Sequence, residues 1–210
     1  MALIVFEGVE GSGKTTQVDS TYHWIKSQLS DQEILITRQP GGTNLGGELR
    51  QMLLYGSNIL SRTELFLYAA DRCQHVEEFL KPNLAQNAVI LCDRYTDSTI
   101  AYQGYGRGLD LELIATLNKL ATTGLESDLT LWLDIDVEIG LERSRERGKL
   151  DRIEQANIDF HKRVQIGYQD LARKYPDRIV RIDASLSMME VQEQIRTVLN
   201  QKFNFGSKSV

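Results

Sequence analysis

Eight residues near the amino terminus restrict the possible folds of this chain more than any other segment. They read GVEGSGKT over residues 8–15, which fits the pattern G-x-x-x-x-G-K-[ST], and they follow the apolar stretch Leu3–Phe6. Such a loop joins a strand to a helix and binds phosphate, because its glycines let backbone N–H groups turn inward and the helix amino end adds positive potential. In this setting Lys14 reaches the β- and γ-phosphates of a nucleotide, and the Thr15 hydroxyl holds Mg²⁺. The expected nucleotide-binding residues are Gly8, Val9, Glu10, Gly11, Ser12, Gly13, Lys14, Thr15 and Thr16.

Short apolar runs alternate with helical stretches along the whole chain, which is typical of a parallel sheet buried on both faces. We therefore expect a single α/β domain over residues 1–210, with an open, doubly wound sheet and helices on both faces. The expected strands are Leu3–Phe6, Ile34–Thr37, Val89–Cys92, Leu129–Leu133 and Ile179–Ile182. The expected helices are Thr15–Leu29, Leu45–Leu54, Thr63–Leu80, Leu111–Ala121, Val137–Arg147, Glu154–Tyr175 and Met188–Gln201, with capping boxes at Ser61-x-x-Glu64 and Ser187-x-x-Glu190 and a frayed tail at 204–210.

The composition sets limits on function. With a net charge of -5, a general nucleic-acid-binding surface is not expected, although clustered arginines can still bind a small anion. No apolar run is as long as a membrane span and no signal peptide precedes the first strand, so we expect a cytoplasmic protein. Cys73 and Cys92 fit no metal-binding spacing and are expected to be two buried thiols.

A P-loop alone leaves GTPases, motor ATPases and small kinases open, and a second motif narrows the choice. Asp93-Arg94-Tyr95 directly follows the expected strand Val89–Cys92. At that end of a strand, the Asp93 carboxylate lies where a metal ion or its waters bind, and Arg94 can hold a phosphate through two hydrogen bonds. By contrast, residues 118–121 (NKLA) only begin like the guanine-reading N-K-x-D, and no strand precedes them, so we interpret that match as accidental.

Two further segments indicate how an acceptor molecule could be recognised. Arg38–Thr43, which reads RQPGGT, follows the second expected strand. Tyr68 and Arg72 are four residues apart and therefore share one helix face. An aromatic ring and a guanidinium presented together can stack on a nucleobase and donate to an oxygen on its edge. Alone, Tyr68 would be interpreted as an ordinary core residue.

Arginines are concentrated in one later stretch, at Arg143, Arg145, Arg147 and Arg152. Such a run of charge is usually a solvated helix face. Here it lies between a helix and a loop that could close over phosphates. The P-loop contains Glu10 and no arginine, so cationic charge for the phosphates must come from elsewhere.

Taken together, these segments resemble the thymidylate kinase family over nearly the entire chain. The matching pieces are the P-loop with an acidic third residue, R-x-P-G-G-T, Y-A-A-D-R, D-R-Y followed by A-Y-Q-G at residues 101–104, and R-G-x-x-D-R-x-E. The resemblance implies the P-loop nucleoside monophosphate kinase fold, with a five-stranded parallel sheet, a mobile lid at about residues 143–154 and a homodimer. It further implies ATP-dependent phosphorylation of dTMP to dTDP in dTTP biosynthesis, in the bacterial subtype whose catalytic arginines lie in the lid.

The resemblance also implies a role for individual residues. Tyr68 takes the thymine-stacking position, where the family often has Phe, and Arg72 would donate to thymine O4. Tyr102 would lie under the sugar and disfavour a ribose 2′-hydroxyl. The implied dTMP-binding residues are Arg38, Tyr68, Arg72, Arg94, Thr99, Tyr102, Gln103, Asp151 and Glu154. The implied catalytic residues are Lys14, Asp93, Arg147, Arg152 and Glu10, with Arg143 binding ATP and with Thr15 and Asp93 holding Mg²⁺ directly or through water.

The chemistry of such a reaction agrees with these residue types. A phosphate acceptor has a second pKa near 6 and is mostly a dianion at neutral pH, so no strong general base is needed. The site should therefore be rich in arginine, lysine and Mg²⁺ and poor in histidine. The three histidines lie in none of the motifs and are expected to be structural or exposed; they are His23, His75 and His161.

Two other functions remain open from the sequence. One is a kinase for a different small acceptor, such as another nucleotide or a sugar acid, although Tyr68, Arg72 and Tyr102 argue against it. The other is a switch or scaffold that binds ATP without phosphoryl transfer. A scaffold would have no reason to combine the P-loop lysine, the D-R pair and the lid arginines.

Overall fold

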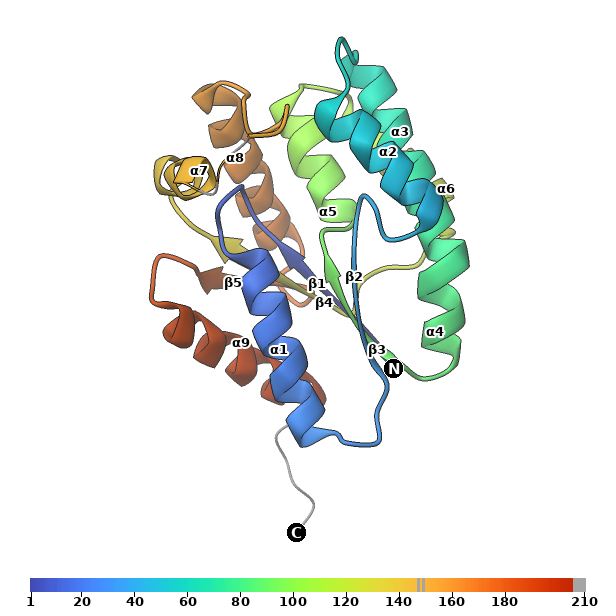
Figure 1. Cartoon of the computed structure of the whole chain (residues 1–210), viewed down its shortest axis with the longest axis vertical. Coiled ribbons are helices and arrows are strands. Elements are labelled where there is room, and N and C mark those ends of the chain that lie inside the picture. The colour runs from blue at the N-terminus through green and yellow to red at the C-terminus, as the bar shows by residue number, and fades with distance from the viewer. Residues whose placement is uncertain (147, 149, 206–210) are drawn as a thin grey trace.

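A single parallel sheet of five strands forms the centre of the molecule, in the order β2-β3-β1-β4-β5 (Figure 1). The computed structural model describes residues 1–146, 148 and 150–205. Every strand runs one residue beyond its expected apolar stretch and ends on a charged side chain at the carboxyl edge. The strands are β1 (Ala2–Glu7), β2 (Ile34–Arg38), β3 (Val89–Asp93), β4 (Leu129–Asp134) and β5 (Ile179–Asp183).

The strand register brings the chemically active sequence segments to one edge. Within the sheet, β1 pairs with β3 on one side and with β4 on the other, and Phe6 lies opposite Asp93. The neighbouring strand β2 places Arg38 opposite the same aspartate. The P-loop, Arg38 and Asp93 therefore emerge side by side, at the edge where open α/β sheets bind their ligands.

Helices cover both faces of the sheet, as expected. On one face α1 and α9 pack against each other, while α8, η2 and the rod formed by α3, η1 and α4 cover the other (Figure 1). The helices are α1 (Lys14–Gln28), α2 (Asn44–Tyr55), α3 (Ser61–His75), α4 (Lys81–Ala85), α5 (Thr96–Thr99), α6 (Leu111–Thr122), α7 (Val137–Glu146), α8 (Ile158–Lys174) and α9 (Met188–Phe203), with π-helical turns η1 (Val76–Leu80) and η2 (Ile100–Gly106).

The helix expected at Glu154–Tyr175 begins later, at Ile158. The Asn157 side chain caps it by accepting a hydrogen bond from the Phe160 N–H. The preceding residues form a turn, because the Asp151 carboxylate accepts hydrogen bonds from the N–H groups of residues 153 and 154. This turn is part of the site described below.

A helical segment at 96–106 was not expected from the sequence. It comprises α5 and η2, and its composition, with two glycines and several β-branched or aromatic residues, disfavours a helix in isolation. The segment packs closely along α8, with Gly167 directly against Tyr105 and Ala101. Tertiary packing therefore overrides local propensity here.

Three smaller expectations require correction, and one is confirmed. The capping box at Ser187 forms, but Leu60 occupies the cap position of α3 and Glu64 is fully buried instead. Of the two thiols, Cys92 is buried but Cys73 is exposed. In the tail, Phe205 is buried and stacks on Phe203, while residues 206–210 lie outside the described part of the chain.

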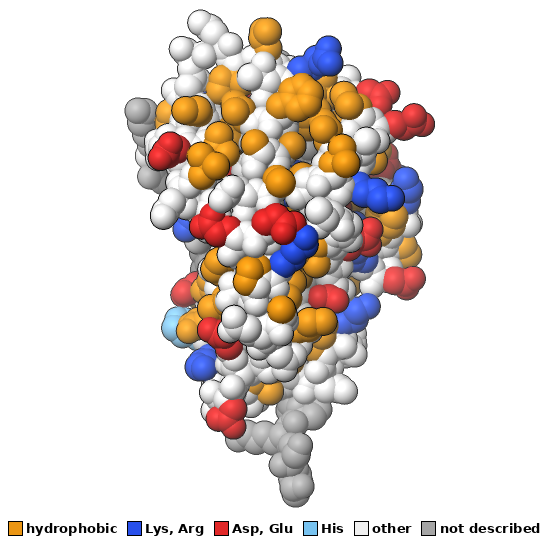
Figure 2. Space-filling view, turned by 90° about the vertical axis from the view of Figure 1, so that its right-hand side faces the viewer, with side chains coloured by type: hydrophobic (Ala, Val, Ile, Leu, Met, Phe, Trp, Pro, Cys, Tyr) orange, Lys and Arg blue, Asp and Glu red, His pale blue; other side chains and the backbone are white. Residues whose placement is uncertain are grey.

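The surface carries apolar side chains over one region. Figure 2 views the molecule from the side on which α2, α3, α4 and α6 lie in Figure 1, and hydrophobic side chains gather over its upper part. The exposed large apolar residues of α2, α3 and α6 are Leu45, Met52, Tyr55, Phe66, Leu111, Leu113 and Leu120. None of the described helices has the length and apolar character needed to cross a membrane.

Two glycines let the P-loop backbone touch α7. A Cβ atom added to Gly140 would overlap the carbonyl oxygen of Glu10, and one added to Gly11 would overlap the carbonyl oxygen of Gly140. Backbone meets backbone here with no room for a side chain, so α7 supports the P-loop directly.

We predict that Gly140→Ala destabilises the fold by about 1–3 kcal/mol, because the new methyl group must push the P-loop away from α7. Gly47→Ala is the matched control, since a Cβ at this position of α2 meets nothing within 4 Å. It should stabilise the protein by about 0.5–1 kcal/mol through helix propensity. Urea unfolding of both variants measures the difference, and equal stabilities would contradict the close contact.

Candidate active site

The P-loop takes the conformation that its glycines allow. Gly11 and Gly13 have φ angles of 67 and 85°, and Gly13 is the residue before the first turn of α1. These left-handed angles are costly for residues with a side chain. They turn the loop back over the amino end of α1, where backbone N–H groups can bind phosphate oxygens.

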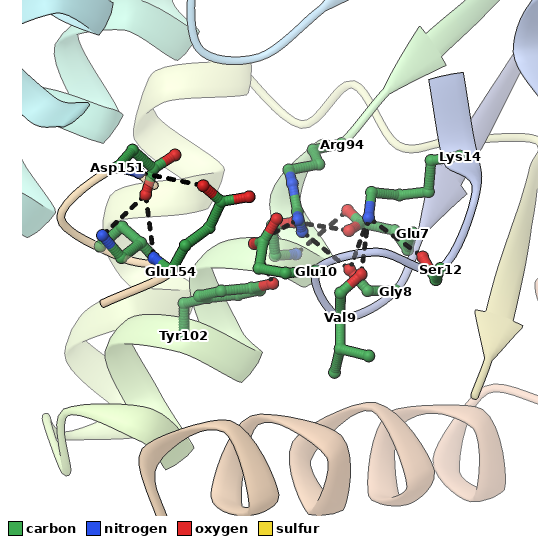
Figure 3. Close-up of polar contacts among 12 residues, drawn as sticks. Glu7, Gly8, Val9, Glu10, Ser12, Lys14, Arg94, Tyr102, Asp151 and Glu154 are labelled. Carbon is green, nitrogen blue, oxygen red and sulfur yellow. Dashed lines mark hydrogen bonds and ion pairs between the residues drawn. The ribbon is translucent and has the colours of Figure 1, made fainter. Parts of the chain in front are cut away.

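Lys14 is folded into the P-loop (Figure 3). Its Nζ donates hydrogen bonds to the carbonyl oxygens of Gly8 and Val9 at 3.0 and 2.8 Å and to the Ser12 hydroxyl at 3.1 Å. Burial, and then the positive charge of Arg94, lower the pKa of Lys14 to about 8. The lysine therefore holds its proton less firmly than usual until an anion arrives.

Thr15 and Asp93 form a partial set of hard oxygen ligands. The Thr15 hydroxyl donates to Asp93 Oδ2 at 3.1 Å. The other carboxylate oxygen, Oδ1, is buried and has no hydrogen-bond partner among the described residues. Mg²⁺ is bound by one or two protein oxygens, with phosphates and waters completing its shell. An unpartnered carboxylate oxygen beside a P-loop hydroxyl fits that requirement.

Arg94 lies at the centre of the site. Its backbone has a φ of 70°, an unusual angle for a residue with a side chain, which is held by a hydrogen bond from its N–H to the Phe6 carbonyl. Its guanidinium donates to Glu10 Oε1 at 2.7 Å and to the Gly8 carbonyl at 3.0 Å, and lies 4.9 Å from the centre of the Tyr102 ring. Burial would lower the pKa of Arg94, but the charge of Glu10 together with Tyr102, Tyr168 and Asp93 outweighs burial and raises it.

Glu10 joins the P-loop to the Asp93-Arg94 segment. Besides Arg94, the Tyr102 hydroxyl donates to its Oε1 at 2.8 Å (Figure 3). Burial alone would raise the pKa of Glu10, but Arg94 and Lys14 outweigh it and lower the pKa to about 2. Glu10 is therefore ionised throughout the physiological range and keeps Arg94 in place.

A narrow slot of about 80 Å³ opens beside the P-loop, into a wider cleft of about 430 Å³. Five residues line both spaces, so the two are continuous; they are Glu10, Gln39, Arg50, Arg94 and Asp151. The slot is further lined by predicted acceptor residues, namely Tyr68, Arg72, Thr99, Tyr102 and Gln103. The cleft is further lined by Gly11, Ser12, Gly13, Lys14, Thr15, Thr16, Arg38, Asp93, Arg143 and Glu154.

Arg72 is held rigidly at the inner end of the slot. It is 2% exposed and donates to Gln39 Oε1, Asn118 Oδ1 and the Tyr95 carbonyl at 3.0, 2.8 and 3.0 Å. All three acceptors are neutral, and they use three of the five guanidinium N–H groups. The remaining N–H groups and the uncompensated charge suit an acceptor oxygen on a planar ligand.

A buried histidine orients the amide that holds Arg72. Because Gln39 uses Oε1 to accept from Arg72, its Nε2 is the group 2.7 Å from His75 Nδ1 and must donate to it. His75 Nε2 then donates to the Thr37 hydroxyl at 2.6 Å. Burial, and then Arg72, lower the pKa of His75 to about 4, so the ring is neutral as this chain requires. His75 is structural, as expected, as is buried His161, whereas His23 is exposed.

Not every predicted site residue reaches the cleft. Arg152 lines neither space and instead binds Glu64 and the Leu53 carbonyl. Gly8 and Val9 line neither space; their carbonyl oxygens accept from Lys14, and that of Gly8 also accepts from Arg94. Arg147, a predicted catalytic arginine in the expected lid, lies outside the described residues.

Sequence reasoning missed residues that line the site. Arg50 of α2 lines both spaces and donates to the Pro40 carbonyl at 2.9 Å, although nothing in its local sequence marks it. Gln39 also lines both spaces, although it occupies only the variable position of R-x-P-G-G-T. Asn118, dismissed as a false guanine motif, turns out to hold Arg72.

Comparison with known proteins agrees with this geometry. A family model described as "Thymidylate kinase" matches residues 6–195. The chain belongs to the thymidylate kinase family. A thymidylate kinase from Nostoc punctiforme is 60% identical over 201 residues, covering 94% of each chain, and one from Trichodesmium erythraeum is 56% identical over 214 residues, covering 95% of each. The crystal structure of a thymidylate kinase from Ehrlichia chaffeensis has a TM-score of 0.79 at 33% identity, and the match covers 93% of this chain and 97% of that one.

Membership in the thymidylate kinase family confirms the fold expected from the resemblance, a five-stranded parallel sheet with a P-loop. Family membership also agrees with a phosphotransferase, an enzyme whose site binds two phosphate-bearing molecules. The individual residue roles stay predictions.

The lowered pKa of Lys14 generates a prediction about stability and pH. In the unfolded chain a lysine keeps its proton up to its ordinary pKa of 10.5, whereas folded Lys14 releases it at about 8. Between these values the unfolded state binds more protons, so the folded state gains stability as pH rises. Relative to Lys14→Met, the wild-type protein should become more stable between pH 8 and 10. Guanidinium unfolding of both proteins at the two pH values measures this, and parallel curves would contradict the lowered pKa.

Proposed function

We propose that this member of the thymidylate kinase family transfers the γ-phosphoryl group of ATP to dTMP, forming dTDP. The observation that carries the proposal is the continuity of two spaces at one sheet edge, a P-loop cleft and a slot that ends at Arg72. Arg94 and Glu10 line both spaces. The family supports a phosphotransferase acting on a nucleotide, and dTMP is the acceptor implied by the names of the relatives.

The residues of the site are suited to holding two anions together. Lys14 and the P-loop N–H groups would bind the phosphates of ATP, while Arg94 and Arg38 would bind the phosphate of the acceptor from the opposite side. Since the acceptor phosphate is already ionised, catalysis consists mainly of positioning and charge stabilisation. Tyr68 would stack on the base, and Tyr102 would contact the sugar.

Mg²⁺ is the cofactor that the donor set supports, with Thr15 and Asp93 as the residues that would hold it. When bound, the ion offsets the negative charge of the ATP phosphates. Asp151 and Glu154 would border the sugar and the metal, as the family resemblance implies.

Two further expectations accompany the proposal. A cytoplasmic location agrees with the role in nucleotide biosynthesis. A homodimer is implied by the resemblance, and the exposed apolar side chains of α2, α3 and α6 (Figure 2) provide a surface suited to a second copy. Sedimentation analysis tests the dimer.

A coupled assay of ADP release, with and without dTMP, is the first test of function. An ATP-binding scaffold would release no ADP in either case, and a kinase for another acceptor would respond to a different member of a panel of nucleotides and sugar acids. ADP release that depends on dTMP supports the proposal.

The neutral acceptors around Arg72 predict the choice of base. Thymine and uracil present O4 to the guanidinium, whereas cytosine presents an amino group and leaves buried donors facing each other. We expect dCMP to be poorer than dTMP by about 10³-fold or more in kcat/KM, and dUMP by about 10-fold to 10²-fold, since it lacks only a methyl contact. Steady-state kinetics with the three acceptors at fixed Mg-ATP measure this ranking. A dCMP value equal to that of dUMP would show that Arg72 does not contact the base.

The position of Lys14 predicts a catalytic loss without unfolding. Lys14→Ala should lower turnover by about 10²-fold or more, because a preorganised cation is removed from the phosphate site. Circular dichroism serves as the control that the variant is folded. Near-normal turnover would refute the assignment of the P-loop.

A further inference from the structure

Glu64 is a buried carboxylate that the proposed mechanism does not use. It lies in α3, one turn before Tyr68, and is 0% exposed. Gln103 Nε2 donates to its Oε1 at 2.8 Å, and Arg107 donates to both of its oxygens at 3.2 Å. Burial would raise the pKa of Glu64, but the hydrogen bonds from Arg107, Gln103 and Arg152 outweigh burial and lower it. The carboxylate is thus charged and fully paired.

The remaining partner of Glu64 comes from a distant part of the chain. Arg152 Nη2 lies 2.6 Å from Glu64 Oε2. The Arg152 guanidinium also donates through Nε and Nη2 to the Leu53 carbonyl at 3.1 and 2.9 Å, and its backbone N–H donates to the Leu54 carbonyl at 3.0 Å. These carbonyls belong to the last turn of α2, where helix carbonyls lack partners and attract cations. Arg152 is therefore fastened to α2 and α3 at once.

The neighbours of these residues face the acceptor slot. Asp151 and Ile153, on either side of Arg152, line the slot, and so do Gln103 and Leu54. The Glu64–Arg152 pair therefore lies behind these lining residues and connects the segments that carry them. Among the described residues, none of the contacts of Arg152 involves the P-loop or the residues that line its cleft.

We propose that Glu64 is a positioning residue for the acceptor, acting through Arg152, and that Arg152 anchors the wall of the slot without touching the transferred phosphoryl group. This inference rests on the proposed function, because it concerns how dTMP is held. It replaces the catalytic role that the sequence assigned to Arg152. The pair fixes Gln103 from one side and the turn at 151–154 from the other, so that both meet the same ligand.

A matched ion pair elsewhere in the fold provides the control. Arg178 pairs with Asp97 at 2.7 Å, and the side-chain exposures are 20% and 1%, compared with 22% and 1% for Arg152 and Glu64. Neither member of the control pair lines the slot or the cleft. Removing Arg152 or Arg178 should therefore cause a similar loss of folding stability, but only the removal of Arg152 should weaken dTMP binding.

The test measures dTMP binding by calorimetry together with kcat and both KM values. Arg152→Met and Glu64→Gln should each weaken dTMP binding by about 10-fold or more, because small displacements of a substrate-positioning wall are costly. The KM for ATP and kcat should change by no more than about 2-fold, the scatter expected for independent sites. Arg178→Met should leave dTMP binding within the same limit. If Arg152→Met does not fold, Arg152→Lys keeps a cation at this position and should still weaken dTMP binding.

The double variant decides whether Glu64 acts through Arg152. Because the two residues form one unit, Glu64→Gln combined with Arg152→Met should bind dTMP no more weakly than the worse single variant. Losses of dTMP binding free energy that add up in the double variant would overturn the coupling. A fall in kcat with unchanged dTMP binding would show that Arg152 acts on the reacting groups. An equal loss of dTMP binding in Arg178→Met would show that the loss in Arg152→Met comes from general destabilisation, which would overturn the proposal. A wild-type protein that neither binds dTMP nor releases ADP with it would refute the proposed function instead.

Discussion

The architecture of the site depends on one buried carboxylate at the end of the central strand. Glu7 is fully buried and accepts hydrogen bonds from the Tyr95 and Ser98 N–H groups and from the hydroxyls of Ser98 and Tyr168. Burial, and then the nearby charge of Asp97, raise its pKa. A buried acid is tolerated only when its hydrogen bonds are complete. Glu7 thereby fixes the turn after β3, and this turn aims Arg94 at the P-loop.

The positive charges around this turn differ in how they are balanced. Arg94 is balanced by Glu10, whereas Arg72 is surrounded by neutral oxygens and Lys14 by backbone carbonyls. The charge of Arg94, which organises the site, is thus neutralised within the protein. The charges of Arg72 and Lys14, which face ligand positions, are not. A protein with a negative net charge can bind two anions side by side because the unbalanced positive charge is confined to these places.

The sequence predicted the fold well because its signals are local and repeated. Each apolar run marked a strand, and the charged residue after each run marked the sheet edge where Arg38 and Asp93 meet the P-loop. The parallel topology then places these strand ends together. The helix at 96–106 escaped prediction because its stability comes from packing on α8, and Arg50 escaped because no neighbour in the sequence marks it.

Glu64 shows the limit of local patterns most clearly. Ser61-x-x-Glu64 fits a capping box, and the same S-x-x-E pattern caps α9 at Ser187, yet Glu64 is buried in the interior instead. Its partners Arg107 and Arg152 come from other elements of the fold. Local patterns cannot show which glutamate meets two arginines in three dimensions. The positioning role proposed for Arg152 differs from the catalytic role predicted from the sequence for the same reason, since its contact with α2 is visible only in the fold.

The contact between Gly11 and Gly140 restricts how this chain can evolve. Neither position can accept a side chain while the other backbone stays in place, so a replacement at one would require a compensating shift in the path of α7. Substitutions in these two segments, which are separated by more than half the sequence, are therefore coupled. Changes that retune the phosphate loop must arise elsewhere, through side chains such as Glu10 that point away from the contact into the cleft.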